Sequence, residues 1–248
     1  MSDAGFRTDI EGLRGVAVLL VVAYHAGLTP FRGGFVGVDV FFVISGFLIT
    51  GLLLREVERS GSIRLRSFYA RRARRLLPLA AATLVVTAIA ARFVMSPVDL
   101  GPFKGDARAA AFYFANWHFA AAQLNYLNGD AATSPLLHYW SIAVEEQFYL
   151  VWPLLLLVVV AARGPLGRLR ASARTRVGVL ATVVIAASFY VSATLTAKES
   201  ALAYYGLHTR AFELGAGALL AVGATRVSRI PKAVAVTSAW VGVALIVA

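Results

Sequence analysis

Apolar runs of nearly twenty residues recur along this chain, and short arginine-rich segments separate them. A helix that crosses a bilayer needs about 20 consecutive apolar residues. The composition agrees, because 59% of the residues are apolar and only 15% are charged, against about a quarter charged in soluble domains. The sequence therefore predicts an all-α fold, a polytopic transmembrane helix bundle that forms one domain over residues 1–248.

Seven of these runs are expected to be membrane helices. They cover about residues 10–28, 35–54, 76–95, 140–162, 177–197, 207–224 and, as the start of a seventh, 233–248. Because the last run stops at Ala248, we expect the sequence to be truncated at its C-terminus. The segment Ala107–Gln123 is also apolar, but it is rich in aromatic residues and poor in leucine.

The distribution of Lys and Arg predicts the orientation of the chain. If the N-terminus is cytosolic and Ala107–Gln123 does not cross, 18 of the 24 Lys and Arg residues lie on the inner side, as the positive-inside rule requires. If that segment crossed alone, Arg163 to Arg176 would lie outside. We therefore expect a re-entrant or interfacial helix near 107–123, Thr133–His138 outside, and a multi-pass protein of the inner or plasma membrane.

The net charge of +11 does not indicate a nucleic-acid partner. The basic residues lie between apolar runs, where topology signals occur, and no soluble basic domain carries them. The chain has no cysteine, which excludes disulfides and thiolate metal sites. We expect the bilayer as a partner and no bound metal.

Ionisable residues inside apolar runs are costly and indicate function. Arg14 and His25 are eleven residues apart, so they share a helix face about 16 Å apart along its axis. A neutral imidazole can accept a proton from a hydroxyl. Asp39 in the next run is expected at a similar depth and could support His25. Two simpler alternatives stay open: an interhelical hydrogen bond for His25 and a helix cap for Asp39.

Later runs carry more of these residues. Glu145 and Glu146 lie in the fourth run, and Glu213 follows Arg210 by three residues in the sixth. A structural ion pair would explain the last two, whereas a shared polar cavity in the outer half of the bilayer would explain all of these carboxylates. Arg72 and Arg75 share one face of a helix at the inner end of the third run, where guanidinium forks could bind phosphate or only fix the topology.

These stretches together resemble the acyltransferase family 3 membrane proteins, which include bacterial O-antigen and peptidoglycan O-acetyltransferases. The resemblance rests on five blocks in family order: Arg14 with His25; Gly33–Thr50, which holds Asp39 and Ser45; Phe68–Pro78, which holds Arg72 and Arg75; Ser134–Pro153, which holds His138, Trp140, Ser141, Glu145 and Glu146; and Thr209–Gly215, which holds Arg210 and Glu213. It covers nearly the whole chain. The loops look most like those of the branch with a C-terminal SGNH-type domain.

The resemblance implies about ten helices, of which about seven are present. It also implies an acyl-CoA donor, acetyl-CoA being expected, no bound cofactor, and an extracytoplasmic glycan or lipid-linked sugar as acceptor. In this hypothesis His25 is the catalytic base, supported by Asp39 or by Glu145 or Glu146. The expected donor-binding residues are Arg14, Arg72 and Arg75, and the expected supporting residues are Ser45, His138, Trp140, Ser141, Arg210 and Glu213. An acyl-histidine intermediate stays open, as do a proton-coupled transporter and an inactive scaffold built on the same bundle.

Overall fold

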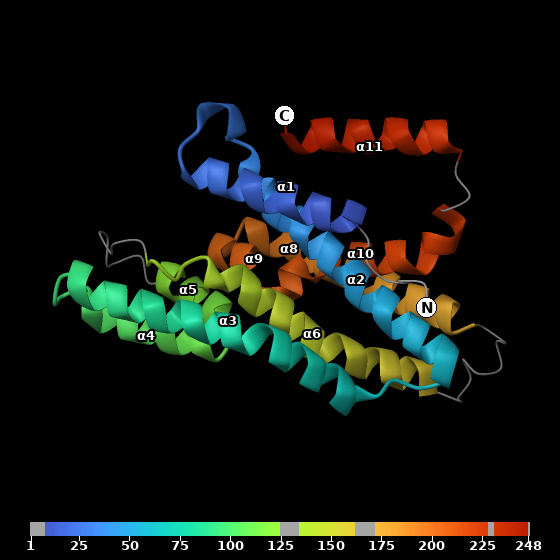
Figure 1. Ribbon diagram of the computed structural model, residues 1–248, viewed down its shortest axis with the longest axis horizontal. Helices are drawn as coiled ribbons and strands as arrows, with labels where there is room; N and C mark the ends of the chain where they lie inside the picture. The colour runs from blue at the N-terminus through green and yellow to red at the C-terminus, as the bar shows by residue number, and fades with distance from the viewer. Residues whose placement is uncertain (1–7, 125–133, 162–171, 228–230, 248) are drawn as a thin grey trace.

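The structure is a computed structural model that describes residues 8–124, 134–161, 172–227 and 231–247. All regular elements in these ranges are helices, and none is a strand (Figure 1). Three positions named above, Thr133, Arg163 and Ala248, lie outside the described residues.

The first two helices, α1 (Thr8–His25) and α2 (Gly37–Ser60), form a hairpin. Two short 3-10 turns, η1 (Thr29–Phe31) and η2 (Gly34–Val36), join them. A Cβ atom on Gly34 or Gly37 would collide with a backbone carbonyl oxygen of α1. The glycines of this turn therefore allow the backbones of the hairpin to approach closely.

The next helices are α3 (Leu65–Val94), α4 (Leu100–Ala111), α5 (Ala115–Leu124) and α6 (Tyr139–Ala161). The helix α3 begins eleven residues before the expected third run, so its arginines lie on the helix itself. The structure has two helices, α4 and α5, where the sequence predicted a single helix near 107–123. Residues 112–114 separate α4 from α5, with Tyr113 at φ 55° in the left-handed region, and the Asp106 carboxylate lies 2.8 Å from His118 Nε2 between the two helices.

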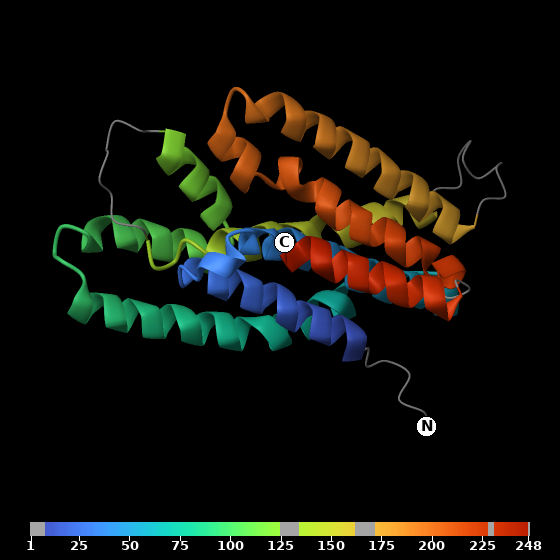
Figure 2. The same ribbon diagram turned by 90° about the horizontal axis from the view of Figure 1, so that it is seen from above.

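The helix α10 (Leu207–Val227) lies at the centre of the bundle, between α2 and α8 (Ala173–Thr196). A Cβ on Gly46 would collide with the carbonyl oxygen of Leu214, and a Cβ on Gly217 with that of Val43. Small residues thus set the crossing of α2 and α10, as is common between membrane helices. The short helix α9 (Ser200–Tyr205) leads into α10, and α11 (Lys232–Val247) lies at the edge of the molecule (Figures 1 and 2).

Four helical segments are long and apolar enough to cross a membrane: Gly34–Ser60, Leu65–Val94, Tyr139–Ala161 and Ala173–Thr196. They correspond to the expected second to fifth spans, and the helices α1, α10 and α11 occupy the other three. The helix α3 would extend about 45 Å at 1.5 Å per residue, which exceeds the roughly 30 Å of bilayer hydrocarbon.

The helix ends gather at two ends of the bundle (Figures 1 and 2). One end holds the α2–α3 turn, the end of α6 and the start of α8. The other holds the α1–α2 turn, the α3–α4 turn and the start of α6. The segment that contains α4 and α5 therefore leaves from one end of the molecule and returns to that same end.

Candidate functional site

His25 is the last residue of α1 and is exposed. Its Nδ1 lies 2.8 Å from the backbone carbonyl oxygen of Val21. Because a carbonyl oxygen can only accept a hydrogen bond, Nδ1 carries the hydrogen in the neutral ring. The other ring nitrogen, Nε2, is then an unprotonated acceptor. The bond to Val21 therefore leaves Nε2 as the ring nitrogen that can accept a proton.

The imidazole of His138 meets His25 edge to face, with the ring centroids 4.4 Å apart. His138 lies just before α6, and its backbone oxygen accepts a hydrogen bond of 3.1 Å from Ser141 Oγ. Burial lowers the pKa of His138, and the charge of His25 lowers it further. The start of α6 thus places a second, preferentially neutral imidazole against the first.

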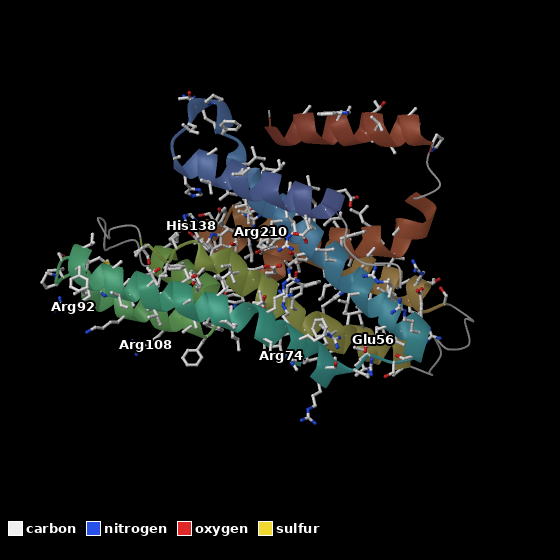
Figure 3. All side chains as sticks on the ribbon, viewed as in Figure 1. Glu56, Arg74, Arg92, Arg108, His138 and Arg210 are labelled. Carbon is white, nitrogen blue, oxygen red and sulfur yellow. The ribbon has the colours of Figure 1, made fainter. Side chains whose placement is uncertain are left out.

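Arg210 joins three elements near these histidines. Its Nη1 lies 3.0 Å from Asp39 Oδ1 and 2.6 Å from Glu213 Oε1, and its Nε donates to the Tyr204 carbonyl oxygen at 3.0 Å. Trp140 and Tyr204 hold their rings 5.8 Å and 5.0 Å from the guanidinium carbon. Figure 3 labels His138 and Arg210 in the same part of the molecule. The ion pair of Arg210 and Glu213, left open by the sequence, is present.

The expected support of His25 by a carboxylate is not seen. Among the described residues, neither Asp39 nor Glu145 nor Glu146 is hydrogen-bonded to His25. Asp39 lies in the first turn of α2 but makes no capping hydrogen bond there. It binds Arg210 instead, because α10 packs directly on α2 and brings a guanidinium within reach.

A second polar cluster surrounds Glu145, which is buried in α6. Its Oε1 accepts hydrogen bonds from Ser45 Oγ at 2.5 Å and from Tyr149 Oη at 2.7 Å. Ser45 comes from α2 and Tyr149 from one turn further along α6. Buried carboxylates need such partners, and this one links two of the candidate membrane helices.

Arg72 of α3 pairs with the neighbouring carboxylate, Glu146. Its Nε lies 3.0 Å from Glu146 Oε2 and its Nη2 lies 2.5 Å from Oε1, a bidentate geometry. The guanidinium carbon also lies 3.3 Å from the centre of the Tyr149 ring. The two charges therefore lie at one depth. This corrects the expectation that placed Arg72 at the inner mouth and Glu146 in the outer half.

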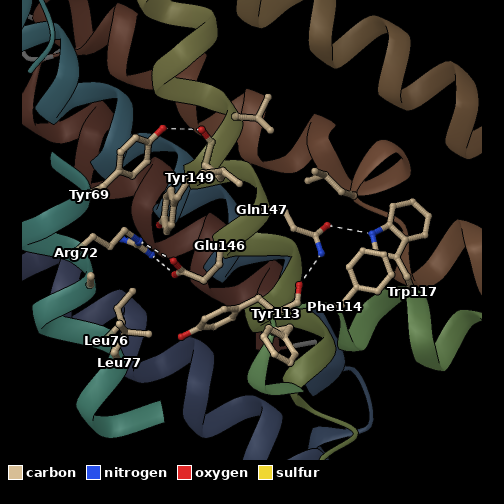
Figure 4. A pocket seen from close by; sticks show the side chains of 15 residues that line it. Tyr69, Arg72, Leu76, Leu77, Tyr113, Phe114, Trp117, Glu146, Gln147 and Tyr149 are labelled. Carbon is tan, nitrogen blue, oxygen red and sulfur yellow. Dashed lines mark hydrogen bonds and ion pairs between the residues drawn. The ribbon is translucent and has the colours of Figure 1, made fainter. Parts of the chain in front are cut away.

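A cavity of about 680 Å³ opens beside this ion pair, between α3, α6 and the turn from α4 to α5 (Figure 4). Its polar side holds Arg72, Glu146 and Gln147, and leucine and aromatic side chains form most of the remaining wall. Gln147 Nε2 donates to the Tyr113 carbonyl oxygen at 2.8 Å, and Trp117 Nε1 donates to Gln147 Oε1 at 3.2 Å. These bonds fix the α4–α5 turn as one wall of the cavity.

The two remaining donor-binding candidates lie apart from this cavity. Arg14 Nη1 lies 3.3 Å from Glu11 Oε1, and the guanidinium carbon lies 5.2 Å from the centre of the Phe41 ring. Arg75 is exposed on α3. Within the described ranges, no group of three or more His, Cys, Asp or Glu residues is placed to hold a metal ion.

Sequence reasoning did not identify three residues of these clusters, Gln147, Tyr149 and Tyr204. Tyr149 does lie four residues after Glu145, the spacing at which helical side chains meet. That spacing was a usable signal, whereas contacts that join different helices leave no trace in a single sequence.

Comparison with known proteins gives a consistent result. A family model described as an acyltransferase domain matches residues 7–248. The peptidoglycan O-acetyltransferase OatA of Listeria monocytogenes is 41% identical over 214 residues, which is 86% of this chain and 33% of the relative. The putative peptidoglycan O-acetyltransferase YrhL of Bacillus subtilis is 36% identical over 215 residues, 86% of this chain and 32% of the relative.

A putative O-acetyltransferase of Staphylococcus aureus is 43% identical over 155 residues, 62% of this chain and 25% of the relative. The chain thus spans at most about a third of the length of these relatives. No solved structure matches.

Proposed function

The chain belongs to this acyltransferase family, and from that premise we propose that it is the membrane part of an O-acyltransferase. The proposed reaction moves an acyl group, acetyl being expected, from cytosolic acyl-CoA to a hydroxyl of an extracytoplasmic glycan. The names of two relatives support peptidoglycan as the acceptor. The four long apolar helices support a multi-pass membrane protein, and the positive-inside rule supports a cytosolic N-terminus.

The fixed tautomer of His25 is the observation that carries this proposal. In the proposed step Nε2 of His25 takes the proton of the acceptor hydroxyl while its oxygen attacks the carbonyl carbon of the thioester. The bond between that carbon and sulfur then breaks. Coenzyme A leaves as a thiolate, which can take the proton back from the imidazolium. The bond from Nδ1 to Val21 keeps Nε2 as the accepting nitrogen.

The residues around Arg210 have a positioning role in this proposal. One guanidinium binds both Asp39 and Glu213 and also the backbone of Tyr204, so it ties α2, α9 and α10 together. Trp140 packs over it from the start of α6, two residues after His138. The Arg210 cluster therefore holds the helices that surround the two histidines.

The cavity beside Arg72 is the proposed place for the acyl-pantetheine arm of the donor. Its volume of about 680 Å³ lies within the usual range for small-molecule sites. Apolar walls suit the methylene groups of the arm, and Arg72, Glu146 and Gln147 offer partners for its amides and carbonyl. Arg14 and Arg75 stay predicted donor-binding residues.

The alternatives of a transporter and an inactive scaffold gain no specific support. A proton relay needs connected titratable groups. Among the described residues, no hydrogen bond joins the Glu145–Glu146 cluster to the residues around Arg210. The family match favours an acyltransferase over both alternatives.

The direct test is His25→Ala, assayed in membrane vesicles with labelled acetyl-CoA and a soluble muropeptide. We expect transfer to fall by about 10²–10⁴-fold, because a positioned general base contributes that much. His118→Ala is the matched control, since His118 pairs with Asp106 in the α4–α5 hairpin and should retain activity. Near-normal turnover in His25→Ala protein that inserts normally would show that His25 is not the base.

A further inference from the structure

A second pocket, of about 310 Å³, lies where α2 ends and α3 begins. Four arginines line it, Arg55 and Arg59 from α2 together with Arg64 and Arg71 from the turn and from α3. Resting on the proposed function, we propose that this pocket binds the phosphate groups of the acyl-CoA donor.

The charges around this pocket are unbalanced. Glu56 is its one carboxylate, and Arg64 already occupies it: Nε lies 3.4 Å from Oε1, and the backbone N–H of Arg64 donates to the same oxygen at 3.1 Å. Ser60 Oγ lies 2.9 Å from the Glu56 carbonyl oxygen and 3.0 Å from that of Ser62. These bonds fix the turn and leave three further guanidiniums without a carboxylate.

Arg55 and Arg59 are both exposed and one helical turn apart. Neither makes a hydrogen bond or ion pair to another residue in the ranges that the structure describes. Arg71 donates only to Ser67 Oγ. Like charges four residues apart destabilise a helix, so an anion between them would relieve the repulsion. Guanidinium forks match phosphate oxygens in pairs.

Arg72, the residue next to Arg71, is not free to bind phosphate. Both Nε and Nη2 of Arg72 bind Glu146, and its guanidinium lies over the Tyr149 ring. Arg71 and Arg72 are neighbours in the chain, yet they line different cavities, Arg71 the arginine pocket and Arg72 the apolar one. The helix α3 could therefore serve the two halves of one donor, its phosphates and its acyl-pantetheine arm.

The position of the pocket agrees with this assignment. Figure 3 labels Glu56 near one end of the molecule and Arg92, which lies in the last turn of α3, near the other. In the proposed orientation the Glu56 end faces the cytosol, where acyl-CoA is present. Topology and the helix dipole also favour positive charge at the end of α2. The topology preference and the helix dipole depend only on positive charge, so lysine at these positions would serve both as well as arginine does.

The experiment exploits that difference with the double variant Arg55→Lys/Arg59→Lys in purified protein. Acetyl-CoA is compared with S-acetylpantetheine, which carries no phosphate. We expect the KM for acetyl-CoA to rise about tenfold or more, because charge-assisted bidentate bonds are lost, while the KM for S-acetylpantetheine stays unchanged. Arg66→Lys is the control: Arg66 is exposed in the first turn of α3 and does not line the pocket. Its KM values should match those of the wild type.

Other outcomes overturn the assignment. If wild-type protein transfers acetyl groups and the double variant keeps the same KM for acetyl-CoA, the pocket does not bind the donor and the proposed function stands. If the double variant instead loses only a dependence of activity on phosphatidylglycerol in nanodiscs, the pocket is an anionic-lipid site. Wild-type protein that transfers nothing from acetyl-CoA would contradict the proposed function itself. If the double variant does not fold, the same KM comparison is made with Arg55→Lys and Arg59→Lys separately.

Discussion

Arg72 and Glu146 form a partly buried ion pair in the cavity wall, with side chains 23% and 16% exposed. Removing one partner of a buried pair leaves an uncompensated charge and destabilises by a few kcal/mol. We predict that Arg72→Gln and Glu146→Gln each lower the thermal stability in detergent, and that the double variant is more stable than the sum of the two losses predicts. Arg75→Gln, at an exposed position, should leave stability unchanged. Additive losses would show that the pair is not coupled.

His138 gives the site a dependence on pH. Its pKa is lowered below the ordinary 6.5, mainly by burial and to a smaller extent by the charge of His25. The unfolded chain therefore binds the proton more tightly than the folded one. The stability of the protein should decrease as the pH falls through 6.5 towards the lowered value, and this part of the decrease should be absent in His138→Gln. Melting curves of both proteins between pH 7.5 and about 5 test this, and parallel curves would contradict it.

At the scale of elements, the crossing of α2 and α10 determines where Asp39 and Arg210 meet. Gly46 and Gly217 lie at this crossing, where a Cβ would overlap backbone atoms of the other helix. We predict that Gly46→Ala and Gly217→Ala separate the helices, lower stability and reduce transfer. Gly223→Ala, on the same α10 with no atom near its Cβ position, should be neutral or slightly stabilising. The measurement is melting temperature together with activity, and a Gly46→Ala protein equal to wild type would contradict the close crossing.

At the scale of the whole molecule, the arrangement of the ends predicts the topology. The α3–α4 turn, which contains Ser96, and the α2–α3 turn, which contains Ser62, lie at opposite ends of the molecule. In a chain without cysteine, Ser96→Cys should react with an impermeant maleimide in intact cells, and Ser62→Cys only after the membrane is opened. Asp130→Cys, outside the described residues, should behave like Ser96→Cys. The reverse pattern would invert the proposed orientation, and labelling of Asp130→Cys only after opening would show that the segment 100–124 crosses.

The sequence by itself determined the all-helical class of fold, the four long apolar helices and the family. Length and hydropathy are sufficient for this, because a membrane helix satisfies its own backbone and needs only a long enough apolar run. The motif residues were found in the same way: His25, Arg210 and Glu213 stand out because ionisable groups are rare in such runs. The ion pair of Arg210 and Glu213 is local, so the spacing of three residues already offered it as one of two explanations, and the structure shows that it forms.

Only the tertiary structure decided the partners. From the sequence, Asp39 was expected to support His25, and Arg72 was expected to bind phosphate. In the packed structure Asp39 pairs with Arg210, and Arg72 pairs with Glu146. These pairs join residues 171 and 74 positions apart, and their geometry depends on the rotation and depth at which helices pack. Periodicity fixes which face of one helix a residue occupies. It does not fix which other helix that face meets, because packing between helices makes that choice.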